Sequence, residues 1–165
     1  MAIAESLLLL TGFVFAHATW NVSDLQKGEL LVPLAIVEKS GQRQLLRFEA
    51  ATQELAIAEG KAALKKHENN VDAWAFAREG QLQESGKYVD VLTVESKAKG
   101  MTETVIFVQR FQPFHKGRFL LLGEPIISIG GKVVPDEEAK VLLAQLRVGI
   151  QSHGKAAELW NQWVR

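Results

Sequence analysis

The pattern of hydrophobic and polar residues has a period of two through the middle of the chain, between residues 72 and 131. Ala73, Ala75 and Ala77 alternate there with larger side chains, as they do in a strand that has one small face and one large face. Clusters of Gly, Pro, Lys and Ser interrupt the alternation at short intervals. The pattern predicts an antiparallel meander whose strands cover residues 72–78, 87–95, 102–112 and 118–122, with further β-structure at 126–129.

A hairpin and a helix precede the meander. Residues 30–38 and 43–50 flank the turn residues Lys39 to Gln42 and predict two paired strands. Pro33 has no N–H for a ladder hydrogen bond, so we expect its strand to lie at a sheet edge or to carry a bulge there. Residues 51–67 form a predicted helix that Thr52 caps, and we expect this helix to cover the small alanine face of the sheet.

Helical patterns occupy both ends of the chain. The segment 2–20 is apolar on nearly all sides, which predicts a helix buried on more than one face. A secretory signal is the alternative, because Ala16, His17 and Ala18 form a small-x-small site. The segment before the apolar run carries Glu5 and no Lys or Arg, which favours the structural helix. Residues 135–150 and 156–163 predict two further helices.

These elements predict the α+β class. We expect a mainly antiparallel sheet of about five to seven strands, with the 51–67 helix on one face and terminal helices packed beside or behind it. A length of 165 residues fits a single α+β domain over residues 1–165. The apolar surface is larger than one sheet layer obviously covers. It comes from the N-terminal helix, the strand at 30–37 and two tryptophans near the C-terminus, and it suggests a homodimer.

Composition narrows the partners and cofactors. Nineteen basic residues balance nineteen acidic ones, so we expect no nucleic-acid partner. The N-terminal apolar run is too short for a span of about 20 residues, so we expect no membrane insertion. The chain has no cysteine, which fits a cytoplasmic location. Its four histidines have no metal-ligand spacing, and no cofactor motif occurs, so we expect neither a metal site nor a cofactor.

A row of basic side chains is the most suggestive chemical feature. If the hairpins pair Arg78 near Tyr88, Tyr88 near Arg110, and Arg110 near Arg118, these four side chains share one transverse row. Three guanidinium groups this close repel unless a carboxylate or a bound anion lies among them. Asp90 is the local carboxylate. The row is therefore either an Arg–Asp network at the solvated end of the sheet or a site for an anionic ligand.

One string resembles a known family. Residues 110–117 read Arg-Phe-Gln-Pro-Phe-His-Lys-Gly, similar to the signature of nucleotidyltransferases related to nicotinamide-nucleotide adenylyltransferase. The resemblance implies phosphate contacts by two histidines in a His-x-Gly-His pattern, of which His115 matches the first and Arg118 replaces the second. Gln109 stands where the family has Gly, and residues 119–122 look like a strand where that fold has a helix. We therefore interpret the string as a hairpin turn.

Two functional hypotheses follow. The first is a non-enzymatic cytoplasmic binding or interaction protein, because the sequence assembles no nucleophile–base pair, metal cluster or phosphate loop. The second is an enzyme or small-molecule binder that recognises a carboxylate or phosphate at the arginine row, with Asp90 or His115 for proton transfer. A concave pocket bounded by these side chains favours the second hypothesis. A sheet end whose arginines are already paired with carboxylates favours the first.

Overall fold

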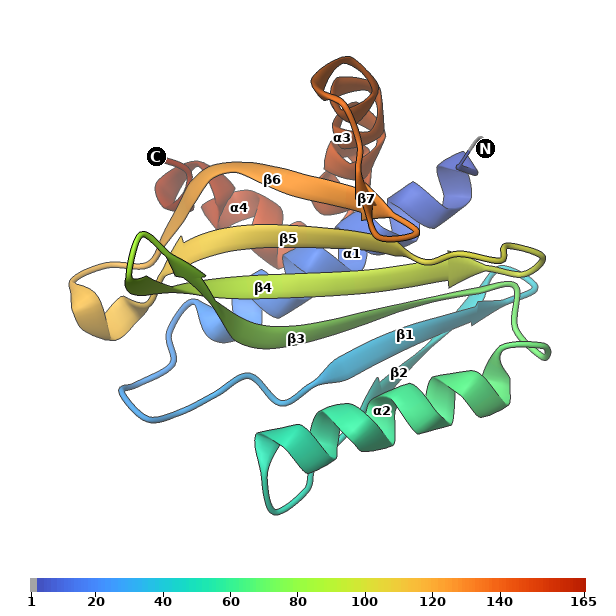
Figure 1. The fold of residues 1–165 in the computed structure, drawn as a ribbon, viewed down its shortest axis with the longest axis horizontal. Coiled ribbons are helices and arrows are strands. Elements are labelled where there is room, and N and C mark those ends of the chain that lie inside the picture. Colours follow the sequence, from blue (N-terminus) through green and yellow to red (C-terminus); the bar gives the residue numbers. More distant parts are fainter. Residues whose placement is uncertain (1–2) are drawn as a thin grey trace.

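The computed structural model describes residues 3–165, which form an antiparallel sheet with helices on both faces (Figure 1). The helices are α1 (Glu5–Val22), α2 (Gln53–His67), α3 (Asp136–Gln151) and α4 (Gly154–Trp163), and a 3₁₀ turn, η1, covers Phe114–Lys116. The strands are β1 (Leu34–Lys39), β2 (Gln42–Arg47), β3 (Ala73–Glu84), β4 (Lys87–Ala98), β5 (Val105–Gln112), β6 (Leu120–Ile129) and β7 (Lys132–Val133). Their order in the sheet is β2-β1-β3-β4-β5-β6-β7. The predicted α+β class is confirmed.

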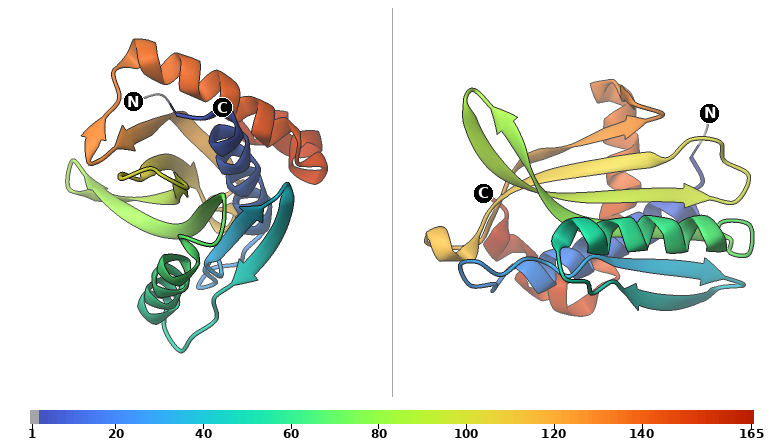
Figure 2. Two further views of the ribbon diagram at one scale, coloured as in Figure 1. Left: turned by 90° about the vertical axis from the view of Figure 1, so that its right-hand side faces the viewer. Right: turned by 60° about the horizontal axis from the view of Figure 1, so that its bottom comes forward.

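Helix α1 lies on the face of the sheet that carries Ala73, Ala75 and Ala77, which we call the α1 face. Small side chains on β3 let the helix approach the sheet closely, and Leu7, Leu10 and Val14 of α1 become fully buried. On its other side α1 packs against α3 and α4, so it lies between the sheet and the C-terminal helices (Figure 2). The N-terminal helix is therefore buried on more than one face, as its apolar pattern predicts.

Helices α1 and α3 cross with their backbones in contact. A Cβ atom on Gly12 would lie 2.1 Å from the carbonyl oxygen of Leu146, and one on Gly149 would lie 2.3 Å from that of Leu9. Neither position has room for a side chain. The two glycines therefore set the distance between the N-terminal and C-terminal parts of the fold.

Helix α2 covers the opposite face, which we call the α2 face. It buries Ala56, Gly60 and Leu64 against Trp74 and Phe76 of β3. The prediction that this helix covers the small alanine face is wrong. Gly60 supplies the reason, because a Cβ atom there would lie 2.7 Å from the ring of Phe76, so the glycine makes room for the aromatic side chain.

The prediction of an edge position or a bulge for the Pro33 strand is also wrong. Strand β1 pairs with β2 on one side and with β3 on the other. Pro33 stands one residue before the strand begins, and its carbonyl oxygen accepts a hydrogen bond of 2.9 Å from the backbone N–H of Phe48. Its missing N–H therefore removes no ladder hydrogen bond from the sheet.

The β3–β4 hairpin is longer than its sequence predicts. The turn consists of Ser85 and Gly86 alone, both with positive φ (50° and 77°), which is typical of a two-residue hairpin turn. Residues 80–84 therefore continue β3, although Gly80 looks like the start of a turn. The longer strand shifts the register, and Arg78 lies opposite Thr93.

Much of the apolar surface that suggested a homodimer is buried within the chain. Ala35, Ile36 and Val37 of β1 and Trp163 of α4 are at least nine-tenths buried. The homodimer stays a prediction, now with fewer apolar residues to support it. Among residues 3–165, no helix combines the length and the apolar character that crossing a bilayer demands.

Candidate functional site

The four residues of the predicted row do not line up in the sheet. Tyr88 lies opposite Gln83, Arg78 opposite Thr93, and Arg110 opposite Val91. The registers from which the row was inferred are therefore wrong: the β3–β4 turn is at residues 85 and 86, and Arg110 lies opposite Leu122 of β6 rather than Arg118. The side chains also divide between the two faces: Arg78 and Arg110 lie on the α2 face, whereas Tyr88 is on the α1 side of β4.

Two of the arginines are paired with glutamates. Arg78 forms an ion pair of 3.1 Å with Glu95. Glu95 lies on β4, directly opposite Phe76 of β3. Arg110 donates two hydrogen bonds, of 2.6 and 2.8 Å, to the carboxylate of Glu84. Such a bidentate pair occupies the guanidinium edge that an anionic ligand would need.

The other predicted site residues are more exposed. Arg118 donates a hydrogen bond of 2.9 Å to the backbone carbonyl of Gln162, and Tyr88 is 66% exposed near the tip of the β3–β4 hairpin. Asp90 and His115, by contrast, reach the same cavity of about 300 Å³ beside the C-terminal end of α1. The structure therefore brings together the two residues that were predicted for proton transfer and leaves the arginines outside.

This cavity, which we call the carboxylate cavity, is enclosed by three parts of the chain. They are the loop after α1, the adjoining ends of β3, β4 and β5, and the η1 turn. The loop after α1 and the residues Phe111 and Pro113 supply its apolar surface. Its polar lining residues are Gln26, Glu29, Glu79 and Gln81, with Asp90, His115 and Lys116.

Glu79 carries the most perturbed carboxyl group of the cavity. It lies on the α1 face of β3, in line with Ala75 and Ala77, where the sheet passes from core to solvent. Its pKa is raised to about 7. Burial is the largest cause, the negative charge of Asp90 acts in the same direction, and a hydrogen bond from the backbone N–H of Leu31 acts in the opposite direction. Near neutral pH the group is therefore half protonated.

Asp90 has partners that leave it only partly neutralised. Gln81, directly opposite on β3, donates a hydrogen bond of 3.3 Å to its carboxylate. The ammonium group of Lys116 lies 3.9 Å away on an exposed side chain. An ion pair of this length across solvent contributes little, so Asp90 keeps most of its field at Glu79.

The charges around the cavity are predominantly negative. Three carboxyl groups, those of Glu29, Glu79 and Asp90, face the ammonium of Lys116 and the imidazole of His115. None of the ion pairs formed by residues 3–165 includes Glu79. The arrangement can accept a positively charged group and can release a proton from Glu79 as it does so.

Glu79 was missed at the level of the sequence, although a signal for it exists. The period of two that places Ala73, Ala75 and Ala77 on one face places residue 79 on the same face. A carboxyl group that continues a buried stripe is a candidate for a raised pKa. The predicted turn at residues 80–86 hid it, because it ended the strand at Arg78.

The described residues, 3–165, hold no group of three His, Asp or Glu side chains that could bind a metal ion. Comparisons with protein-family models, with curated proteins and with solved structures found no match to this chain, so the function proposed for the site rests on its own geometry.

Proposed function

We propose that the chain is a non-enzymatic binding protein whose carboxylate cavity takes a small organic cation, such as an alkylamine or a guanidinium compound. The observation that carries the proposal is the carboxyl group of Glu79, which faces a cavity of about 300 Å³ with a pKa of about 7. A cavity of this volume is at the lower end of the range for small-molecule sites. Its apolar lining, with Leu25 and Phe111, suits the hydrocarbon part of such a ligand.

The sign of the charge selects the ligand class. A cation beside Glu79 and Asp90 gains from both carboxylates, whereas an anion is repelled by both. The arginines that suggested an anionic ligand contact Glu95 and Glu84 instead. Satisfied arginine pairs favour the binding-protein hypothesis, and the anionic-ligand hypothesis is tested separately in the Discussion.

Binding of a cation is expected to release a proton. Because Glu79 is half protonated near pH 7, an ammonium group that favours the carboxylate form displaces the proton into the buffer. Titration calorimetry of butylamine, putrescine and guanidinium compounds at pH 7, in phosphate and in MOPS, measures this release. The observed enthalpy differs between the two buffers if protons are released.

The matched variants are Glu79→Gln and Glu59→Gln. Glu59 is exposed on α2, far from the cavity. We expect Glu79→Gln to lose both the binding and the buffer dependence, and Glu59→Gln to keep both. Binding that is unchanged in Glu79→Gln, or binding without any buffer dependence, contradicts the proposal.

The proposal requires neither a particular compartment nor a second copy of the chain. A cytoplasmic location, homodimer formation and the absence of a nucleic-acid partner stay predictions from composition and hydrophobic pattern. Each has a direct measurement: fractionation, ultracentrifugation at micromolar concentration, and a gel-shift titration at low salt.

A further inference from the structure

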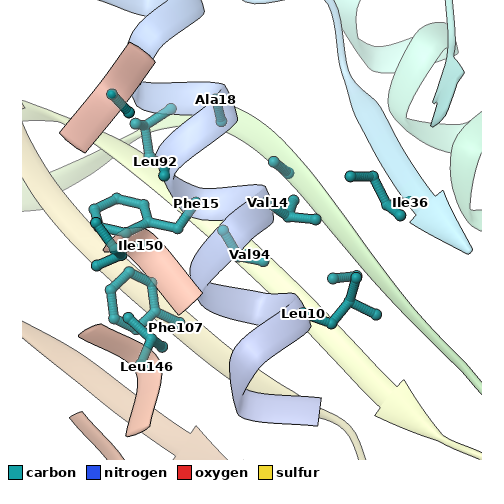
Figure 3. Close-up of a cluster of buried hydrophobic side chains, with 14 of the residues drawn as sticks. Leu10, Val14, Phe15, Ala18, Ile36, Leu92, Val94, Phe107, Leu146 and Ile150 are labelled. Carbon is teal, nitrogen blue, oxygen red and sulfur yellow. The ribbon is translucent and has the colours of Figure 1, made fainter. Parts of the chain in front are cut away.

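A second cavity, of about 240 Å³, lies on the α1 face of the sheet between β5, β6 and the C-terminal helices. It shares no lining residue with the carboxylate cavity. Most of its wall is apolar and comes from five elements: α1, β5, β6, α3 and α4. The apolar wall residues include Phe15, Phe107, Leu143, Leu146, Ile150 and Trp160. Figure 3 shows Phe15, Phe107, Leu146 and Ile150 next to one another at this wall.

One buried polar side chain, Gln109, interrupts the apolar wall. It is only 4% exposed and lies at a bulge, where the pairing of β5 with β6 shifts between Val108 and Arg110. Its Nε2, which carries two hydrogens, lies within hydrogen-bond distance of three backbone carbonyl oxygens, those of Arg110 at 2.9 Å, Leu122 at 3.2 Å and Gly123 at 3.1 Å. Because carbonyls surround Nε2, the orientation of the amide is fixed.

The amide oxygen of Gln109 therefore points away from these carbonyls. Among residues 3–165, no donor forms a hydrogen bond to it. Nor is this oxygen fully buried. Among residues 3–165, the one fully buried side-chain polar atom without a hydrogen-bond partner is Nε1 of Trp74. The oxygen is thus an accessible acceptor without a protein donor, on a side chain that lines the cavity.

The rim of the cavity is charged and solvated. Glu124 and Arg147 form an exposed ion pair of 3.3 Å at the entrance, and Arg165 lies beside them. The interior, by contrast, presents aromatic edges and faces: the rings of Phe15 and Phe107 are 4.7 Å apart, and those of Phe15 and Trp160 are 5.4 Å apart. Such a wall favours a planar aromatic ligand.

We propose that this cavity binds a small aromatic molecule with one hydrogen-bond donor, of the phenol or indole class, whose O–H or N–H donates to the amide oxygen of Gln109. The volume fits this class, since an apolar protein cavity of about 150 Å³ accommodates benzene. The ring contacts the apolar wall, and the donor pairs with the amide oxygen of Gln109.

The test compares ligands that carry the donor with close analogues that lack it. Phenol and indole are titrated against the wild-type chain beside benzene and 1-methylindole, with calorimetry and the shift in melting temperature as readouts. We expect phenol and indole to bind about tenfold more tightly than their partners without a donor, as one buried hydrogen bond implies. Equal affinity within each pair overturns the role of Gln109.

Two variants then locate the site. Leu143→Phe adds volume at the cavity wall, whereas Leu142→Phe makes the same change at the adjacent position of α3, outside the wall. We expect at least about a fivefold loss of phenol and indole binding in Leu143→Phe and none in Leu142→Phe. No binding to the wild type, or equal binding to both variants, overturns the proposal. The wild-type ligand comparison keeps the proposal testable if Leu143→Phe does not fold.

Discussion

The imidazole of His153 donates a hydrogen bond to the imidazole of His17 across the contact between α1 and the start of α4. The backbone N–H of Ala156 donates to Nδ1 of His153 at 3.1 Å, so the proton of the neutral ring is on Nε2. That Nε2 lies 3.0 Å from Nδ1 of His17, which must accept. His153 thus caps α4 and links it to α1. The cap needs an unprotonated Nδ1 on His153, and the link needs an unprotonated Nδ1 on His17.

This pair predicts a loss of stability in mild acid. Burial lowers the pKa of His17, and the charges of His153 and Arg47 lower it further. Burial also lowers the pKa of His153, and the positive charge of Lys155 acts in the same direction. Their contribution is complete above the ordinary pKa of 6.5 and is lost as the pH falls below it, because the unfolded chain takes up protons more readily. Melting temperatures between pH 8 and pH 5 measure the loss.

The control is His17→Gln combined with His153→Asn, in which asparagine still caps the helix but neither residue titrates. We expect its melting temperature to change less with pH over this range. Glu79 acts in the opposite direction, so both proteins are best compared in the Glu79→Gln background. A wild-type profile as flat as that of the double variant contradicts the prediction.

Glu79→Gln is expected to stabilise the chain above neutral pH. The folded-state pKa of about 7 is above the ordinary 4.5, so the stability that protonated Glu79 contributes is complete below pH 4.5 and is lost as the pH rises through 7. At pH 8 we expect the variant to be about 1 to 2 kcal/mol more stable, since one pKa unit corresponds to ~1.4 kcal/mol and partial exposure reduces the effect. Urea unfolding at pH 8 and pH 5 measures it, and a gain of equal size at both pH values would argue against burial of the charge.

Alanine at either glycine of the α1–α3 crossing is expected to destabilise the fold. Alanine is normally better than glycine inside a helix, by about 1 kcal/mol. At Gly12 and Gly149, however, the new Cβ would lie less than 2.5 Å from a backbone oxygen, so the helices must separate. We expect a loss of about 1 to 3 kcal/mol in denaturant unfolding.

Gly154→Ala is the matched control for this change, because a Cβ atom at that helical position meets nothing within 4 Å. It should be neutral or slightly stabilising. If Gly12→Ala and Gly149→Ala behave like Gly154→Ala, the close crossing of α1 and α3 is incorrect.

Arg110→Gln tests the anionic-ligand hypothesis. The guanidinium of Arg110 donates hydrogen bonds to both carboxylate oxygens of Glu84. These bonds compete with any hydrogen bond to another anion. We therefore expect phosphate and citrate to shift the melting temperature of the variant as much as that of the wild type. A stabilisation that appears in the wild type and disappears in Arg110→Gln would restore the arginines as an anion site.

Much of the fold could be predicted from the sequence, because the hydrophobic period separates strands from helices without knowledge of their partners. The faces of the sheet were harder to assign. Leu55 looks like part of the buried stripe of α2 but is 53% exposed, whereas Gly60, which has no side chain to count as apolar, lies at the contact. Packing at α2 is decided by the space that Phe76 needs, which is a property of the partner strand.

The candidate site depended on register, which hydrophobic pattern alone does not fix. The turn between β3 and β4 places Ser85 at a positive φ of 50°, a conformation that serine rarely adopts, so Gly80 gave the stronger turn signal. The resulting error in register produced the predicted arginine row and concealed Glu79. Asp90 and His115 nevertheless meet, because both lie near the same end of the sheet.

The burial of α1 has a consequence for how the chain reaches its native state. Almost every group that covers this helix comes later in the sequence: β3 and β4 on one side, α3 and α4 on the other. During synthesis its leucines and valines therefore stay accessible until the last helices leave the ribosome, and contacts over such long sequence separations form slowly. Chaperone dependence and aggregation of C-terminally truncated chains are the expected signs of this order of assembly.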